Sequence, residues 1–135
     1  MQQIVYAGAA IGVDPRVYLA IANAESTLFS APNAIAKNNP FGLKIPGGLI
    51  NFTSGVQTAI ASASATIIRV INNGNNVGRN GASLGWFYSG SPGAWCVGPC
   101  SQGLFNATDT MLALGGNPSS FGSLPSNILG VPCEW

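Results

Sequence analysis

The chain has 135 residues, of which 47% are hydrophobic and only 7% charged, and its net charge is +1. Because an average soluble domain has about 25% charged residues, this composition offers no basic stripe for nucleic acid, and no apolar run reaches the ~18 to 20 residues of a membrane span. Histidine is absent, which excludes His-activated nucleophiles and the usual His-containing metal sites, so we expect no metal and no cofactor.

Two helices are predicted at the start of the chain. Residues 4–11 form a short helix that ends at "GVDP". A second helix begins at Asp14-Pro15, since Asp caps helices and Pro suits the first helical position, and it is expected to end near Ser30. Its apolar stripe has helical spacing and consists of Val17, Ile21, Ala24 and Leu28.

A loop and a third helix follow. Residues 31–54 are rich in Pro, Gly and Asn, which predicts a long loop with a hairpin-like segment near residues 49–52. Thr53 or Ser54 caps a helix that runs to about Ile71, where Asn72-Asn73-Gly74 stops it. We expect this helix to be central in the core, through a face made of Val56, Ile60, Ala63 and Ile67.

The second half of the chain has weaker signals. A short helix is predicted near residues 82–88, then a glycine-rich segment. A last helix spans about Asn106 to Leu114, capped by Asn106 or Thr108 and with Asp109 in its first turn. The sequence therefore predicts a mainly α fold: one small helical domain over residues 1–135, with long loops and at most a minor β-hairpin. We expect it to be a monomer.

The three cysteines bear on the compartment. The loop "WCVGPC" is short enough for a bridge between Cys96 and Cys100, and Cys133 could pair with either instead. A disulfide would place the protein in an oxidising compartment, outside the cell or in the cell envelope, although the chain begins without the features of an export signal. Three buried thiols are the alternative.

Glu25 is one of two glutamates in the chain. At 100° per residue it lies about 40° from Ile21 and about 60° from Leu28, at the edge of the apolar stripe. Partial desolvation there disfavours the charged form and would raise the pKa of the carboxyl. A carboxyl that keeps its proton near neutral pH can act as the general acid on a glycosidic oxygen. A solvated helix glutamate is the plainer interpretation.

Three segments carry a family resemblance. The segment "GVDPRVYLAIANAES" resembles the opening of lysozyme-like lytic transglycosylases, where a helix carries a catalytic Glu followed by Ser. The segment "NNPFGLK" is similar to the "NLFGIK" region of bacterial cell-wall glucosaminidases of the flagellar and autolysin type. The segment "FYSGSPGAW" resembles the transglycosylase motif "AYNAGPG". The three occur in the family's order and span roughly residues 4–95, so the resemblance implies a lysozyme-like fold.

The resemblance assigns roles to individual residues. It implies that Glu25 is the catalytic acid/base, that Tyr88 is the tyrosine lining the cleft, and that Ser26, the serine that follows the acid, contacts the sugar. Phe41-Gly42 matches the turn that brings backbone groups to the sugar. Two departures concern substrate contacts: "FGLK" stands where transglycosylases have "GLMQ", and Ser89 replaces the asparagine of "YN".

Aromatic and amide side chains are candidates for holding the sugar. Trp86 and Trp95 flank the tyrosine motif, and an exposed Trp offers a flat face to a pyranose ring. Asn38 and Asn39 offer amides to hydroxyl and N-acetyl groups, although turn formation explains Asn-Asn-Pro nearly as well.

The remaining carboxylates have simpler explanations. Asp14 is explained as a helix cap, Asp109 as a partner of the helix dipole, and Glu134 is the penultimate residue, where fraying is usual. A single-acid mechanism therefore fits better, with the N-acetyl group of the substrate assisting or with 1,6-anhydro closure.

The resulting hypothesis is a hydrolase or lytic transglycosylase that cleaves β-1,4 bonds of peptidoglycan, a secreted enzyme of cell-wall degradation with antimicrobial action. A non-catalytic glycan-binding module of the same fold and a chitin-degrading enzyme are the alternatives. A chitosanase is disfavoured because a polycation requires more than four acidic residues.

Overall fold

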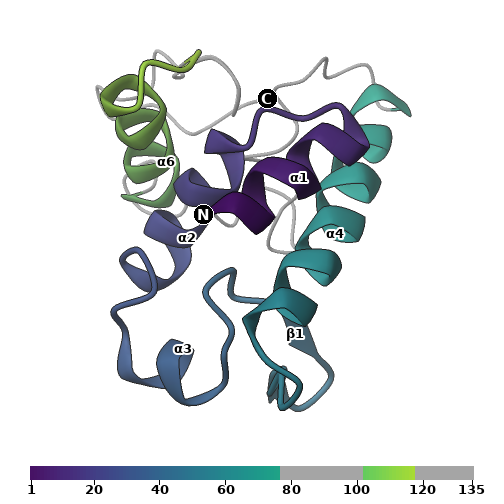
Figure 1. The fold of residues 1–135 in the computed structure, drawn as a ribbon, viewed down its shortest axis with the longest axis vertical. Coiled ribbons are helices and arrows are strands. Elements are labelled where there is room, and N and C mark those ends of the chain that lie inside the picture. The colour runs from purple at the N-terminus through teal and green to yellow at the C-terminus, as the bar shows by residue number, and fades with distance from the viewer. Residues whose placement is uncertain (77–101, 118–135) are drawn as a thin grey trace.

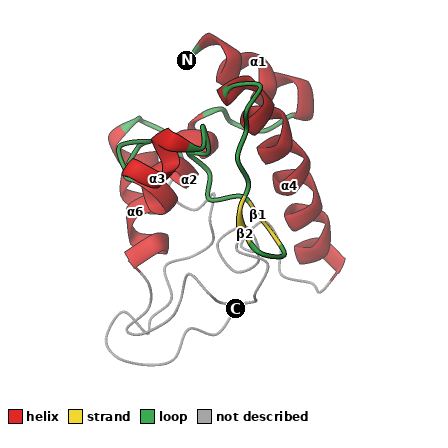
Figure 2. Ribbon diagram, turned by 90° about the horizontal axis from the view of Figure 1, so that it is seen from below, coloured by secondary structure: helices red, strands yellow, loops and turns green. Residues whose placement is uncertain are grey.

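The computed structural model describes residues 1–76 and 102–117, and within them the chain is mainly helical, as predicted (Figures 1 and 2). Helices α2 and α6 pack side by side, and α1 packs along α4. The elements, in chain order, are α1 (Gln2–Ile11), α2 (Arg16–Ser26), α3 (Pro32–Ala36), β1 (Lys44–Ile45), β2 (Gly48–Leu49), α4 (Val56–Asn76) and α6 (Gln102–Ala113).

The junction between α1 and α2 follows the prediction. Gly12 ends α1 with a left-handed φ of 70°, a conformation that glycine adopts without steric penalty. Pro15 already has helical angles, with φ −60° and ψ −22°, and Oδ1 of Asp14 accepts a hydrogen bond from the backbone N–H of Arg16 at 3.0 Å. Asp14 therefore satisfies one of the unpaired donors at the start of α2.

Helix α2 ends earlier than predicted. It stops at Ser26 instead of near Ser30, because Thr27, Leu28 and Phe29 all have left-handed backbones, with φ of 52°, 55° and 66°. The backbone N–H of Leu28 bonds to the carbonyl of Ala22 at 3.1 Å. The turn rotates Leu28 out of the predicted stripe, and its side chain is 56% exposed. The prediction that Leu28 extends the buried stripe was therefore wrong.

The segment after this turn is more ordered than a plain loop. Helix α3 was not predicted, because its five residues are too few for a periodic pattern; Pro32 occupies its start, where a missing N–H costs nothing. The hairpin lies at residues 44–49 instead of 49–52. Lys44 pairs with Leu49 and Ile45 with Gly48 in antiparallel register.

Helix α4 is longer than predicted. It runs from Val56 to Asn76 and so passes through Asn72-Asn73-Gly74. Glycine in a helix costs about 1 kcal/mol relative to alanine, but propagation of an established helix adds a hydrogen bond for each residue. Ile60, Ala63 and Ile67 are buried as predicted.

Tyr18 ties α2 to its neighbours. It is fully buried, its hydroxyl is hydrogen-bonded to Oγ of Ser64 on α4, and its ring meets that of Phe41 edge-on at a centroid distance of 6.1 Å. The buried hydrophobic cluster around it consists of Val17, Tyr18, Ala20, Ile21, Ala22, Phe41, Leu43, Phe52, Ala59, Ile60, Ala63, Ile67, Ala107 and Met111.

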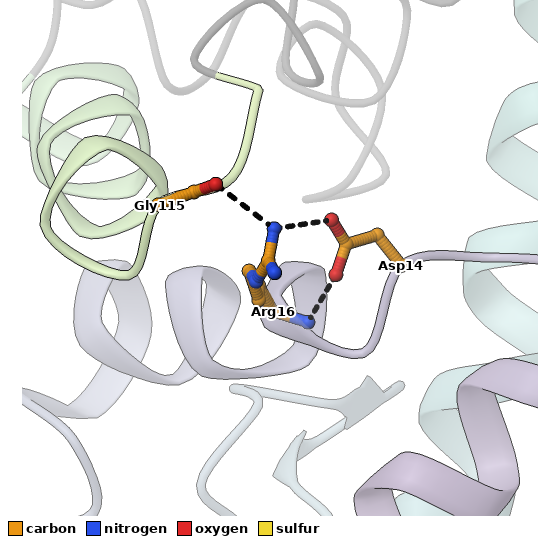
Figure 3. Close-up of polar contacts among 3 residues, drawn as sticks. All are labelled: Asp14, Arg16 and Gly115. Atoms are coloured by element: carbon orange, nitrogen blue, oxygen red, sulfur yellow. Dashed lines mark hydrogen bonds and ion pairs between the residues drawn. The ribbon is translucent and has the colours of Figure 1, made fainter.

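Helix α6 begins four residues before the predicted start. Asn106 and Thr108 therefore lie inside the helix and are not its caps, and Asp109 is not in its first turn. At the other end, Nη1 of Arg16 donates to the carbonyl of Gly115 at 3.1 Å and lies 3.5 Å from Oδ2 of Asp14 (Figure 3). The side chain of Arg16 thus links the start of α2 to the residues that follow α6.

Several predictions concern residues outside the described ranges. These are the short helix near residues 82–88, the aromatic residues Trp86, Tyr88 and Trp95, and the cysteines Cys96, Cys100 and Cys133. Among the helices of residues 1–76 and 102–117, none is by itself long and apolar enough to cross a membrane. Helices α1 and α2 pass that test only as a pair, bent by 114°.

Candidate active site

Glu25 lies on the last turn of α2, and its half-buried side chain rests against Gly42. A methyl group placed on Gly42 would lie 2.5 Å from Oε2 and 2.9 Å from Cδ of Glu25, which is closer than real Cβ contacts. Gly42 also has a left-handed φ of 64°. The fold therefore brings together Glu25 of "NAES" and Gly42 of "NNPFGLK", which belong to two of the three segments that carry the resemblance.

Ser26, next to the acid, holds the loop that contains Gly42. Its side chain is 3% exposed, and its hydroxyl lies 2.7 Å from the carbonyl of Pro40 and 2.9 Å from that of Ala22. Its Oγ accepts a hydrogen bond from the N–H of Phe29 at 2.9 Å. The expectation that Ser26 contacts the sugar is corrected, because its hydroxyl is buried and its bonds go to backbone groups of the chain.

Asn39 is likewise a structural residue and not a surface contact. It is 1% exposed, and its amide Nδ2 donates to the carbonyls of Leu43, at 2.8 Å, and Ile50, at 3.1 Å. Its Oδ1 accepts from the N–H of Leu43 at 3.0 Å. The predicted contact with substrate is corrected for this reason. Sequence alone could not assign this role, because an Asn-Asn-Pro segment is equally typical of turns and of binding loops.

Asn38 and Phe41 also take part in the local structure. Asn38 has a left-handed φ of 50°, which asparagine tolerates better than most residues, and its Nδ2 donates to the carbonyl of Phe52 at 3.1 Å. Phe41 is 1% exposed, and its ring lies in the core. This exposed fraction covers the backbone and the side chain together, so the expected contact of Phe41 with the sugar is corrected.

Asp14 lies too far from Glu25 to act with it as a pair of carboxylates. Asp14 precedes the first turn of α2 and Glu25 lies on its last, so at 1.5 Å per residue they are about 16 Å apart along the helix axis. Glycosidases that use two carboxylates hold them about 5 to 9.5 Å apart. Asp109 is exposed on α6. Among the described residues there is no group of three His, Cys, Asp or Glu side chains that could hold a metal ion.

An apolar cavity lies on another side of the loop. Its volume is about 210 Å³, and it is open to the surface. It runs between α1, α2, α4 and the left-handed turn, and Glu25 is not among the residues that line it. The residues that line it are Met1, Gln3, Ile4, Leu19, Ala22, Leu28, Phe29, Pro40, Phe41, Val56 and Ile60. Such walls offer few partners to the hydroxyl groups of a sugar, so this cavity is not part of the candidate site.

Comparisons of the chain with protein-family models, with characterised proteins and with solved structures found no significant match. The functional argument therefore depends on the motifs and on the geometry around Glu25.

Proposed function

We propose that this chain cleaves β-1,4 glycosidic bonds of peptidoglycan, as a lysozyme-like hydrolase or lytic transglycosylase, with Glu25 as its single acid/base. The observation that carries the proposal is the contact between the Glu25 carboxyl and the backbone of Gly42. It joins two separate motifs of the resemblance at one place, and the acid there is half-buried, as a general acid requires.

The chemistry needs one carboxyl at the scissile bond. Protonated Glu25 donates its proton to the glycosidic oxygen, and the bond from that oxygen to C1 breaks. The electron deficiency at C1 is relieved by the carbonyl oxygen of the substrate's own N-acetyl group or by its 6-hydroxyl. In the first case water then attacks C1, returns a proton to Glu25 and releases the acetamido oxygen, which gives a hydrolysed end. In the second case Glu25 takes up the hydroxyl proton, and a 1,6-anhydro sugar forms. Substrate assistance of this kind removes the need for a second protein carboxylate.

The composition supports a neutral glycan as the substrate. Four acidic and five basic residues in 135 leave little charge for recognition of a polyion, so hydroxyl and acetamido groups would be recognised by backbone amides and aromatic faces. In the proposal Tyr88 lines the cleft opposite Glu25, and Trp86 and Trp95 stack on sugar rings. The site of action would be the cell envelope or the medium outside the cell.

The decisive experiment compares Glu25→Gln with Glu134→Gln on purified peptidoglycan and on chitin. Glu25→Gln keeps the size of the side chain but cannot donate the proton, so turnover should fall by at least about 100-fold, the lower range for general acid catalysis. Sedimentation with peptidoglycan should persist. Glu134→Gln alters the only other glutamate and should retain full activity. Circular dichroism checks that both variants fold.

Each outcome of this experiment has a distinct meaning. Cleavage of peptidoglycan by Glu25→Gln at the wild-type rate would refute the catalytic assignment. Sedimentation with peptidoglycan without cleavage by the wild type would indicate a glycan-binding module instead of an enzyme. Mass spectrometry of the products separates the two reactions, because anhydro ends are lighter than hydrolytic ends by one water.

A further inference from the structure

Asn39 acts as a substitute for a β-strand neighbour. Its side-chain amide donates to the carbonyl of Leu43 and accepts from the N–H of the same residue, so it pairs both backbone groups of Leu43 at once. The second N–H of the amide bonds to the carbonyl of Ile50. A neutral amide suits this position, because it offers donors and an acceptor together without bringing a charge into the core.

These bonds fix the place of Gly42. Gly42 precedes Leu43 in the chain, so the position of its backbone depends on how Leu43 is held. On the other side of the loop, the hydroxyl of Ser26 holds the carbonyl of Pro40. The loop of residues 39–43 is thus held at Pro40 by Ser26, and at Leu43 by Asn39 together with the N–H of Ile50, which donates to the Leu43 carbonyl at 3.0 Å. Between these points the backbone of Gly42 meets the carboxyl of Glu25.

We propose that Asn39 is a positioning residue for Glu25: by pairing with Leu43 and Ile50 it holds the backbone of Gly42 against the carboxyl and so sets where the acid lies. The catalytic consequence rests on the proposed function, whereas the contact itself does not. Asn39 does not touch the substrate in this proposal and acts only through the loop.

The first test uses no substrate. Glutamate labelled with ¹³C at Cδ gives two signals in this chain, from Glu25 and Glu134, and Glu25→Gln assigns them. In Asn39→Ala the Glu25 signal should move while the Glu134 signal stays. Asn39→Asp keeps the acceptor for the Leu43 N–H but loses both donors and brings a charge into the core, so the Glu25 signal should move in this variant as well. Met111→Ala is the control: it opens a cavity at a fully buried residue of α6 and should leave the Glu25 signal in place.

The second test measures activity at a temperature where all variants are folded. Asn39→Ala should lower kcat by about 100-fold, the loss expected when a catalytic group is displaced by about 1 Å, with KM little changed. Met111→Ala should keep a kcat near that of the wild type even if it melts earlier. In the wild type, the amide of Leu43 should exchange with solvent as slowly as core amides, which can be measured even if no Asn39 variant folds.

The results separate this inference from the proposed function. The positioning role would be overturned if the Glu25 signal did not move in Asn39→Ala, or if the Leu43 amide exchanged rapidly. Equal losses of kcat in Asn39→Ala and Met111→Ala would overturn it as well. A wild type without activity on any glycan would overturn the proposed function, and the ¹³C measurement would still decide whether Asn39 places Glu25.

Discussion

Gly42 meets two requirements at once. Its backbone is left-handed, with φ 64°, and its Cα hydrogen faces the carboxyl of Glu25 where a side chain would not fit. Gly12 meets only the first requirement: its φ is 70°, and no atom lies within 4 Å of the place where a Cβ would stand. A comparison of the two glycines therefore distinguishes the cost of a left-handed backbone from the cost of close contact with the Glu25 carboxyl.

We expect Gly42→Ala to destabilise the fold more than Gly12→Ala does. Each substitution should cost about 1 to 2 kcal/mol for a left-handed alanine, and Gly42→Ala should add about 1 to 3 kcal/mol for overpacking against Glu25. Urea unfolding curves of the two variants measure the difference. Equal losses of unfolding free energy would show that the carboxyl moves aside freely.

At the residue scale, sequence reasoning predicted the position of Glu25 on its helix correctly but not the roles of the residues around it. The helical wheel placed Glu25 at the edge of the buried stripe, and its side chain is half-buried. Ser26 and Asn39 were expected to face the sugar and instead lie inside the loop. Their hydrogen bonds join residues up to fourteen positions apart, and such pairings depend on the path of the loop, which local sequence patterns do not determine.

At the scale of elements, the turn after α2 is the least expected feature. Three consecutive non-glycine residues, Thr27 to Phe29, are left-handed, and each costs about 1 to 2 kcal/mol. Hydrogen bonds to Ala22, Asn23 and Ser26 hold them in place. Strain of this kind gathers at functional sites, and this turn begins two residues after Glu25.

Replacing Leu28 by glycine should relieve part of this strain. The Leu28 side chain is 56% exposed, so little burial is lost, and we expect Leu28→Gly to stabilise the protein by a few tenths to about 1 kcal/mol. Leu112 on α6 is similarly exposed, at 58%, but lies within a right-handed helix, where Leu112→Gly should destabilise by about 1 kcal/mol. Thermal melting of both variants tests this prediction. A shift of the melting temperature in the same direction for both would show that the backbone of Leu28 is not strained.

The sequence predicted which segments form helices better than it predicted where those helices end. The helices now labelled α1, α2, α4 and α6 were all predicted, and for α2 and α4 the prediction depended on apolar residues at helical spacing. The early end of α2 and the extension of α4 through Asn73-Gly74 were missed. At helix ends, local propensities differ by about 1 kcal/mol or less, so hydrogen bonds to the rest of the fold decide where the helix stops.

At the scale of the whole molecule, ion pairs between described residues contribute little to stability. In the described residues the ion pair between Asp14 and Arg16 is the only salt bridge, and both side chains are more than a third exposed, so its contribution is small. The core is instead a cluster of aliphatic and aromatic residues around Tyr18. The fold class could be predicted from composition and periodicity, whereas the packing of α6 on α2 could not.

We expect unusual tolerance of acid. With four acidic residues and no histidine, the side-chain charge changes by only about four units between pH 7 and pH 2, using ordinary pKa values. Little self-repulsion builds up over this range, so stability should decline only gently as the carboxylates are protonated. The melting temperature measured from pH 7 to pH 3 tests this, and a collapse within that interval would refute it.

The hydrogen bond between Arg16 and Gly115 also has a consequence for the order in which the chain folds. The two residues are 99 positions apart, so α2 leaves the ribosome long before its partner helix has been made. Contacts over such separations form late, because the entropy of closing the intervening chain must be overcome first. Helices α1, α2 and α4 can gather early, but the side of α2 that α6 covers stays open until α6 has been synthesised. A nascent chain arrested before residue 102 should therefore be the form most exposed to aggregation and to chaperones.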